Sequence, residues 1–165
     1  MCVALATLLL ALLAGCGGGG GSSTTSSTGG EELTKSELIA KGDAICKDAS
    51  DRFAELQASP PTTAEETATF TQQLIDITES EVSQLRALAA PASVKPALDD
   101  YLKAMDKNVA VLKEGLAAAQ RSDATAYANA QAKAVKDQVE RLQLAQAVGF
   151  RECSRPAGTA PSSSG

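Results

Sequence analysis

The sequence predicts an all-α protein, an antiparallel up-down-up-down four-helix bundle closed by one disulfide. Between residues 31 and 153 the strong helix formers Ala, Leu, Lys, Glu and Gln are abundant, and the alternation typical of strands is absent. Four apolar stripes with helical spacing are separated by short breaks, two of which contain prolines. Because short connections make successive helices neighbours, these stripes favour an antiparallel bundle.

The first helix is expected from Thr34 to about Ala58. Thr34 and Glu37 have the spacing of a capping box, and the proline pair at 60–61 stops the helix. Gly42 interrupts the apolar face, which costs about 1 kcal/mol relative to alanine unless a neighbouring helix uses the gap for a close approach. The apolar face comprises Leu38, Ile45, Ala49, Phe53 and Leu56.

The second and third helices are bounded by the proline-containing breaks. The second is expected to begin near Thr62 or Thr63, each followed three residues later by a glutamate, and to reach the break at Pro91. The third opens at Ser93 with Pro96 in its first turn, where a missing N–H group matters little. Their apolar faces are Phe70, Leu74, Ile77, Leu85 and Leu88 in the second, and Leu98, Leu102, Met105, Val109, Leu112, Leu116 and Ala119 in the third.

The fourth helix is expected to be capped by Ser122 or Asp123. It ends at Gly149, a residue suited to the left-handed position that follows a helix. Its many alanines predict close packing against a neighbour. The expected core-facing residues are Ala128, Ala132, Val135, Val139 and Leu142.

The N-terminal segment carries a targeting signal. Leu13, Ala14, Gly15 and Cys16 close an uncharged apolar run that begins at Cys2. This run is shorter than the roughly 20 residues that a membrane-spanning helix needs, and it suits the core of a signal peptide. No Lys or Arg precedes it, which departs from the charged start of most secretory signals.

The four residues at 13–16 resemble the lipobox of bacterial prolipoproteins. The resemblance implies that Cys16 receives a diacylglyceryl group and that signal peptidase cuts before it, leaving a lipid anchor on the extracytoplasmic face of the cell membrane. An ordinary cleaved signal, with Cys16 left as a free thiol, is the alternative. With the Gly-Phe-x-x-Cys ending at 149–153, the pattern resembles small secreted helical lipoproteins of high-GC Gram-positive bacteria, a likeness that brings no catalytic residues.

This interpretation divides the chain into four parts. Residues 1–15 are the signal peptide, and residues 16–32 are the lipidated cysteine followed by a Gly/Ser/Thr linker that behaves as flexible coil. Residues 33–153 form the bundle domain. Residues 154–165, rich in Pro, Ala, Ser and Gly, are expected to form a disordered tail.

Two of the four cysteines remain to form a disulfide once Cys2 and Cys16 are assigned to the signal and the anchor. After Gly149 the chain must turn back, and residues 150–153 recover about 13 Å when extended, enough to bring Cys46 near Cys153. We interpret this bridge as structural, since closing a loop of about a hundred residues contributes on the order of 4 to 5 kcal/mol in an oxidising compartment. A redox or metal-binding pair would need a CxxC spacing or further His and Cys ligands.

The composition argues against catalysis and against nucleic-acid binding. The chain contains no histidine, which removes the usual general base and the commonest metal ligand, so neither an enzyme, a metal nor a cofactor is expected. The net charge is −5 and the basic residues are interspersed with acidic ones, so the sequence predicts no basic patch to which a nucleic acid could bind.

Four carboxylates are candidate cation ligands if their faces converge, namely Glu79, Glu81, Asp99 and Asp100, although solvated surface charges are the favoured interpretation. Glu81 differs from the others because it falls on an apolar stripe, where a carboxylate needs a partner such as lysine or tyrosine. Val82 can take its place through a local shift in register. Most other charges are expected in i, i+4 pairs, such as Glu37–Lys41, Asp43–Lys47, Asp48–Arg52, Asp99–Lys103 and Asp137–Arg141.

Two functions from different classes follow. The first is a membrane-anchored, non-catalytic binding or structural module whose exposed helix face meets an envelope protein or cell-wall component. The second is a carrier that holds a small apolar ligand or a cation between its helices, with Glu81 at the site. A filled interior would favour the first function and a hollow interior the second; an enzyme that uses carboxylates alone ranks last.

Overall fold

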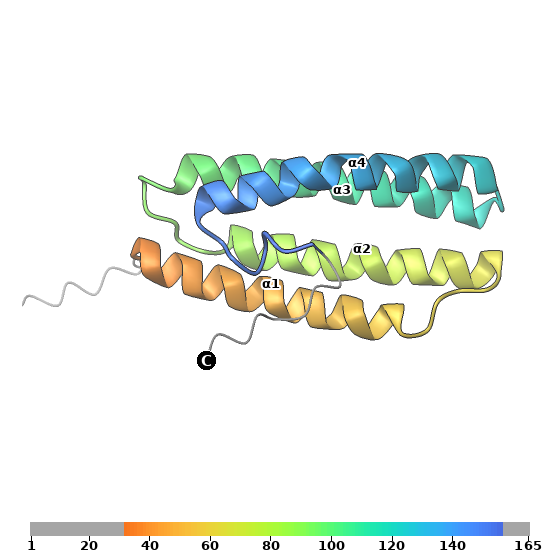
Figure 1. The fold of residues 1–165 in the computed structure, drawn as a ribbon, viewed down its shortest axis with the longest axis horizontal. Helices are drawn as coiled ribbons and strands as arrows, with labels where there is room; N and C mark the ends of the chain where they lie inside the picture. The colour runs from red at the N-terminus through yellow and green to blue at the C-terminus, as the bar shows by residue number, and fades with distance from the viewer. Residues whose placement is uncertain (1–31, 157–165) are drawn as a thin grey trace, which may run out of the picture.

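The computed structural model describes residues 32–156. The predicted signal peptide, Cys16, residues 17–31 of the predicted linker and residues 157–165 of the predicted tail lie outside the described residues. The described part contains four helices and no strand: α1 (Lys35–Gln57), α2 (Ala64–Arg86), α3 (Lys95–Gln120) and α4 (Ala124–Val148). Successive helices run antiparallel (Figure 1), which confirms the predicted all-α four-helix bundle. None of these four helices is apolar enough over its length to cross a membrane.

The first two helices begin at the predicted capping boxes. The Thr34 hydroxyl accepts a hydrogen bond from the Glu37 N–H at 3.2 Å, and the Glu37 carboxylate accepts one from the Thr34 N–H at 2.8 Å. Thr63 and Glu66 form the same arrangement at the start of α2. The Glu66 carboxylate also accepts the Thr62 N–H at 2.7 Å, so both candidate threonines contribute and Thr63 is the cap.

The start of α3 differs from the prediction at Ser93, since the helix begins at Lys95. The N–H groups of Val94 and Lys95 both donate to the carbonyl of Pro91 at 2.9 Å. These bonds make residues 91–94 a turn and leave Val94 as the cap residue, without a side-chain hydrogen bond.

Both ends of α4 lie at residues that the sequence predicts as caps. Asp123, rather than Ser122, is the cap, and its carboxylate accepts the Ala126 N–H at 2.9 Å. Gly149 has φ 106°, the left-handed conformation that glycine adopts without strain. Here the chain leaves the helix and turns back toward α1 (Figure 1).

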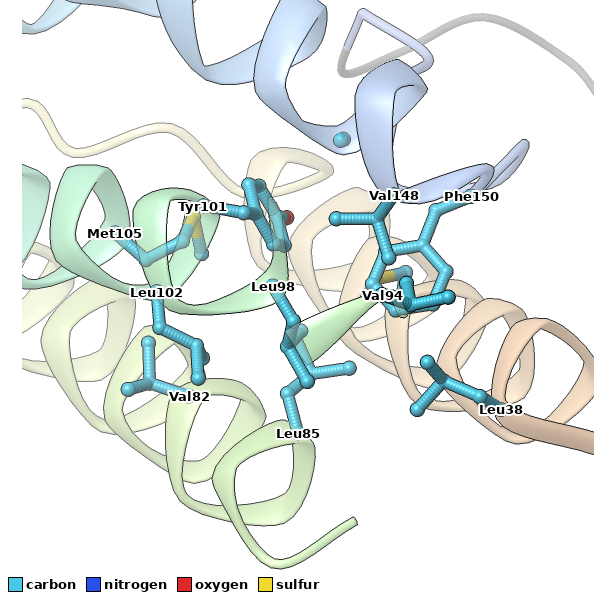
Figure 2. Close-up of a cluster of buried hydrophobic side chains, with 12 residues drawn as sticks. Leu38, Val82, Leu85, Val94, Leu98, Tyr101, Leu102, Met105, Val148 and Phe150 are labelled. Atoms are coloured by element: carbon cyan, nitrogen blue, oxygen red, sulfur yellow. The ribbon is translucent and has the colours of Figure 1, made fainter. Parts of the chain in front are cut away.

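The helices pack unequally. α3 packs extensively against α2 and α4, and α1 packs against α2, but α1 and α4 scarcely meet. The main core lies at the end of the bundle where α1 begins and α4 ends, and includes Leu38, Leu85, Leu98, Val148 and Phe150 (Figure 2). The bundle is therefore closed at this end and open between α1 and α4 beyond it.

The prediction of the core face of α4 is wrong for four of its five residues, and the fifth, Leu142, is half-buried. Ala128 and Ala132 are exposed, and the side chains of Val135 and Val139 are 67% and 61% exposed. The physical reason is that α1 does not cover this side of α4. The helix instead buries Ala130, Ala145 and Val148, and a Cβ atom on Gly115 of α3 would lie 3.5 Å from that of Ala130. The expected close packing thus occurs on a different face.

Phe150 lies in the main core, at the end of the bundle where α4 ends. Its side chain is 2% exposed and its ring meets the Tyr101 ring edge-on, with centroids 6.0 Å apart. The ring also occupies the space beside Gly42, where a Cβ atom would collide with the ring carbons of Phe150. Gly42 is therefore used for a close approach, by the segment after α4 rather than by a helix.

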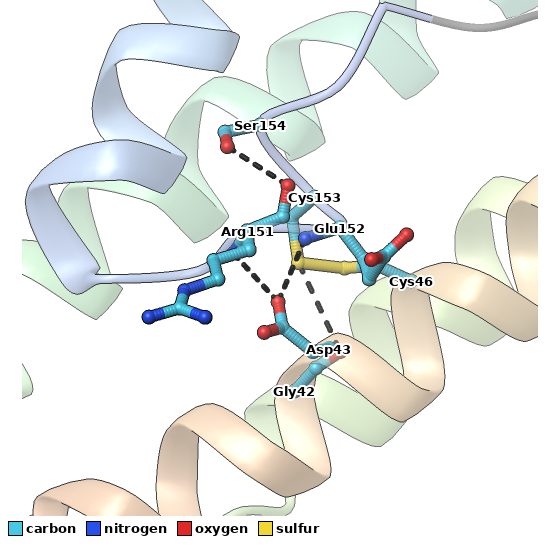
Figure 3. Close-up of a disulfide and its surroundings, with 7 residues drawn as sticks. All are labelled: Gly42, Asp43, Cys46, Arg151, Glu152, Cys153 and Ser154. Carbon is cyan, nitrogen blue, oxygen red and sulfur yellow. Dashed lines mark hydrogen bonds between the residues drawn. A yellow bond between two sulfur atoms is a disulfide. The ribbon is translucent and has the colours of Figure 1, made fainter. Parts of the chain in front are cut away.

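The segment after α4 is fastened to α1 by a disulfide and by hydrogen bonds (Figure 3). Cys46 and Cys153 are bonded, with Cα atoms 5.1 Å apart, which confirms the predicted pair. The Asp43 carboxylate accepts the N–H groups of Arg151 and Glu152 at 2.7 and 2.9 Å. Together with Phe150 these bonds fix residues 150–153 on the N-terminal half of α1.

Gly42→Ala is expected to lower the free energy of unfolding by about 2 kcal/mol, because the added methyl group overpacks a buried ring. Gly115→Ala is the matched control, since its new Cβ meets only ordinary van der Waals contacts. This control is expected to gain up to about 1 kcal/mol from helix propensity. Urea denaturation of both variants tests the difference, and equal or higher stability of Gly42→Ala than of Gly115→Ala would contradict it.

Candidate functional site

An open groove of about 270 Å³ runs between α1 and α4. Residues of α2 and α3 form its floor, and the segment that carries Glu152, Cys153 and Arg155 closes one end. The groove lies between two helices, α1 and α4, that make few or no close contacts with each other. Its apolar lining includes Phe53, Leu74, Met105, Leu112, Val135 and Leu142.

Glu81 of α2 is the one carboxylate that lines this groove from a helix. Its side chain is 8% exposed, and it makes no hydrogen bond or ion pair among residues 32–156. Burial raises the pKa of Glu81 to about 7, and the positive charge of Arg141 opposes that shift. The predicted position on the apolar stripe is therefore correct, and the neighbouring Val82 is buried as well rather than taking its place.

Tyr101 of α3 and Arg141 of α4 accompany Glu81 in the groove. The Tyr101 side chain is buried, and its hydroxyl makes no hydrogen bond within the described part of the chain. Burial, followed by the charge of Glu81, raises the pKa of Tyr101, so the phenol stays protonated. The half-buried Arg141 side chain makes one hydrogen bond, from Nη1 to the carbonyl of Ala134 at 3.4 Å. A guanidinium has five N–H donors, so most of its donors remain available.

Two opposing effects act on the pKa of Arg141. Burial lowers the pKa of Arg141, whereas the neighbouring Tyr101, Asp137 and Glu81 raise it. Asp137 itself forms an ion pair with Lys107 at 3.2 Å. The sequence-based pair of Asp137 with Arg141 is thus wrong, and Arg141 is left facing the groove.

The disulfide lies next to Glu81. A carboxylate oxygen of Glu81 and the sulfur atoms of Cys46 and Cys153 all lie within 4.8 Å of one another. Because the two sulfurs are bonded to each other, they are not thiolate ligands for a metal ion. The bridge instead contributes an apolar, covalent wall beside the carboxyl group.

The other candidate carboxylates do not converge with Glu81. Glu79 forms an ion pair with Lys113 at 2.7 Å, Asp99 forms one with Lys95 at 2.8 Å, and Asp100 is exposed. The four acidic residues therefore do not build the shared cation site that the sequence left open.

Most of the expected i, i+4 pairs are replaced by other contacts in the described residues. Asp48–Arg52 forms at 4.0 Å, whereas Glu37 caps α1 and Asp43 holds the C-terminal segment. Lys47 pairs with Asp51 at 2.6 Å. Sequence spacing identified surface-charged positions but not which of several partners each would choose.

Sequence reasoning missed Tyr101 and Arg141 as groove residues. Tyr101 lies three residues after Leu98 and four before Met105, so helical periodicity already places it on the core face of α3. Arg141 precedes Leu142 at the edge of the predicted apolar face of α4. The sequence indicates that a carboxylate on the stripe needs a partner such as lysine or tyrosine, and Tyr101 on the core face of α3 fits that requirement.

The fold and the groove define a disulfide-closed helical bundle with an acid group at the bottom of an open groove. Comparison of the chain with protein-family models, curated proteins and solved structures finds no match.

Glu81→Gln is expected to change how stability depends on pH. The folded-state pKa of about 7 exceeds the ordinary value of 4.5, so ionisation of Glu81 destabilises the folded protein. This destabilisation is absent below pH 4.5, grows as the pH rises to 7 and is complete above it. Relative to Glu81→Gln, the unaltered protein should lose about 3 kcal/mol across that interval.

Denaturation in urea at pH 4.5 and pH 8 measures this change, with the exposed Glu79→Gln as the matched control. The stability difference between Glu79→Gln and the unaltered protein should lack a change of this size, because the side chain of Glu79 is 47% exposed. A pH-independent difference between Glu81→Gln and the unaltered protein would show that Glu81 is solvated.

Proposed function

We propose that this protein is a non-catalytic binding lipoprotein, anchored by Cys16 outside the cytosol, whose groove holds a small ligand with an apolar body and a polar head. The observation that carries this proposal is the unpaired carboxyl group of Glu81, 8% exposed on the floor of a groove of about 270 Å³. An unpaired buried polar group is costly, and a ligand that bonds to it recovers that free energy. Natural ligand sites combine an apolar lining with a few polar groups in this way.

The polar groups of the groove favour binding over catalysis. The chain has no histidine, and the lining offers no paired nucleophile and base. Glu81, Tyr101 and Arg141 supply hydrogen bonds and charge, which are sufficient to hold a ligand.

A second depression is less suited to a ligand. It lies over α2 and α3 beside the exposed ion pairs Arg86–Asp106 and Lys95–Asp99. Four of its five charged residues are already paired and, among residues 32–156, only Lys103 is not, so a ligand there would have to displace existing contacts.

The anchor is supported by the sequence at 13–16 and by the disulfide, which persists in an oxidising compartment. In the host, an alkyne-bearing palmitate analogue is expected to label the protein. Cys16→Ser should abolish the labelling because the acyl groups are attached through that sulfur. Cys2→Ser is the control and should remain labelled. Label that persists in Cys16→Ser would contradict the anchor.

The groove is tested by filling it. In lipid nanodiscs, the full chain is expected to increase the fluorescence of the apolar probe N-phenyl-1-naphthylamine above that of empty discs. Ala134→Trp places an indole in the groove and should remove this increase. Val139→Trp, on the exposed side of the same helix, should retain it. Equal fluorescence of the two variants would contradict binding in the groove.

A second candidate function follows from the exposed apolar face of α4. Val135 and Val139 are large apolar side chains in water, which is the arrangement expected where a helix of an envelope protein docks. Val139 does not line the groove, so Val139→Asp separates the two functions. Loss of a cross-linked envelope partner in this variant, with probe binding unchanged, would favour docking on α4.

A further inference from the structure

Building on the proposed function, we propose that the groove takes an amphiphile with an anionic head, a carboxylate on an apolar chain, and that Glu81 takes up one proton when the ligand binds. The proton comes from solvent and forms the O–H bond of the Glu81 carboxyl group. No covalent bond forms between ligand and protein.

Three groups around the head site can donate hydrogen bonds to one anion. Arg141 has free N–H donors, the Tyr101 hydroxyl has no partner among residues 32–156, and Glu81 becomes a donor once protonated. They come from α4, α3 and α2, so a head group between them would join three helices. Charge-assisted hydrogen bonds of this kind are short and strong.

The charge balance selects an anion over a cation. Arg141 keeps its positive charge across the neutral pH range. When Glu81 is neutral, a carboxylate cancels the charge of Arg141, whereas an ammonium head would add a second positive charge to a poorly hydrated site. When Glu81 is ionised it already compensates Arg141, and an added anion is repelled.

The other charged groups in and beside the groove form ion pairs, and of these Asp137 also raises the pKa of Arg141. On the C-terminal segment, Glu152 and Arg155 line the groove but pair with each other at 3.0 Å. Next to Arg141 on α4, Asp137 pairs with Lys107 of α3. The α1 wall contributes Cys46, Ala49, Ser50, Phe53 and Gln57, none of which carries a charge in the disulfide-bonded protein.

The apolar chain of the ligand would follow the groove away from the disulfide. The head groups Glu81 and Tyr101 lie at the disulfide end, since Glu81 is next to both sulfurs and Tyr101 meets Phe150. Farther along, Leu74, Leu112 and Val135 provide apolar walls. A ligand of this shape places its polar end against the three donors and its chain between α1 and α4.

Titration calorimetry of the full chain in nanodiscs with decanoate, decylamine and decanol tests this proposal, with empty discs as the blank. Decanoate should bind at least tenfold more tightly than decylamine at pH 6. Its affinity should fall about tenfold between pH 6 and pH 8, because the protonated fraction of a group with a pKa of about 7 falls by that factor. At pH 8, buffers of different ionisation enthalpy should report close to one proton taken up per decanoate.

The variants separate the roles of the residues. Arg141→Gln should weaken decanoate binding at least tenfold, whereas the exposed Arg121→Gln leaves it unchanged. Glu81→Gln should abolish proton uptake and remove the change between pH 6 and pH 8. A merely structural role of Glu81 would not alter proton uptake.

The outcomes distinguish this inference from the proposed function. Binding of decylamine or decanol that equals or exceeds that of decanoate would overturn the anionic head while leaving a ligand groove. Decanoate binding without proton uptake would overturn the role of Glu81. If none of the three probes binds, both the inference and the ligand groove fail.

Discussion

Phe150 fills the space left by the missing side chain of Gly42, and this contact fastens the end of the chain to α1. The Cys46–Cys153 bridge and the two amide hydrogen bonds to Asp43 lie within one or two turns of the same place. A buried aromatic ring, a covalent bond and charge-assisted hydrogen bonds thus act together on one short stretch of α1. Any side chain at position 42 would displace the ring of Phe150, which lies beside the disulfide and the hydrogen bonds to Asp43.

This attachment sets the shape of the whole bundle. α1 is joined to α4 by the C-terminal segment, while the two helices themselves make few or no close contacts. A groove remains where a closed bundle would have packed side chains, and Glu81, Tyr101 and Arg141 occupy the part nearest the bridge. The same attachment that closes the core therefore provides the wall beside a buried carboxyl group. In the proposal, that carboxyl group is the proton-accepting part of a site for an anionic amphiphile.

The four helices, the Thr34 cap and the disulfide could be predicted from the sequence because each depends on local spacing or on cysteine number. The caps of α2 and α4 could each be narrowed to two neighbouring residues. Thr34 with Glu37, Thr63 with Glu66, and Asp123 are capping signals that need no knowledge of packing. The fourth apolar stripe could not be placed correctly, because its environment depends on whether α1 covers α4. Val139 has the pattern of a core residue and the exposure of a surface residue.

The candidate site was only partly predictable for the same reason. The sequence shows Glu81 as a charged residue on an apolar stripe. Tyr101 and Arg141 come from two other helices, and the sequence does not determine how those helices are rotated about their axes. Arg141 has an acidic residue at the favourable i−4 spacing, and only the fold shows that Lys107 takes that partner. Long-range choices among several possible charge partners are set by tertiary packing.

The carboxyl group of Glu81 is buried at the floor of the groove without a hydrogen-bond partner among residues 32–156. The ¹³C chemical shift of its carboxyl carbon, assigned by its loss in Glu81→Gln, reports its protonation directly as the pH is varied. We expect the titration of the Glu81 carboxyl group to have its midpoint near pH 7 in the ligand-free protein. A midpoint near the ordinary value of 4.5 would show that the carboxylate is solvated, which would contradict its burial without a partner.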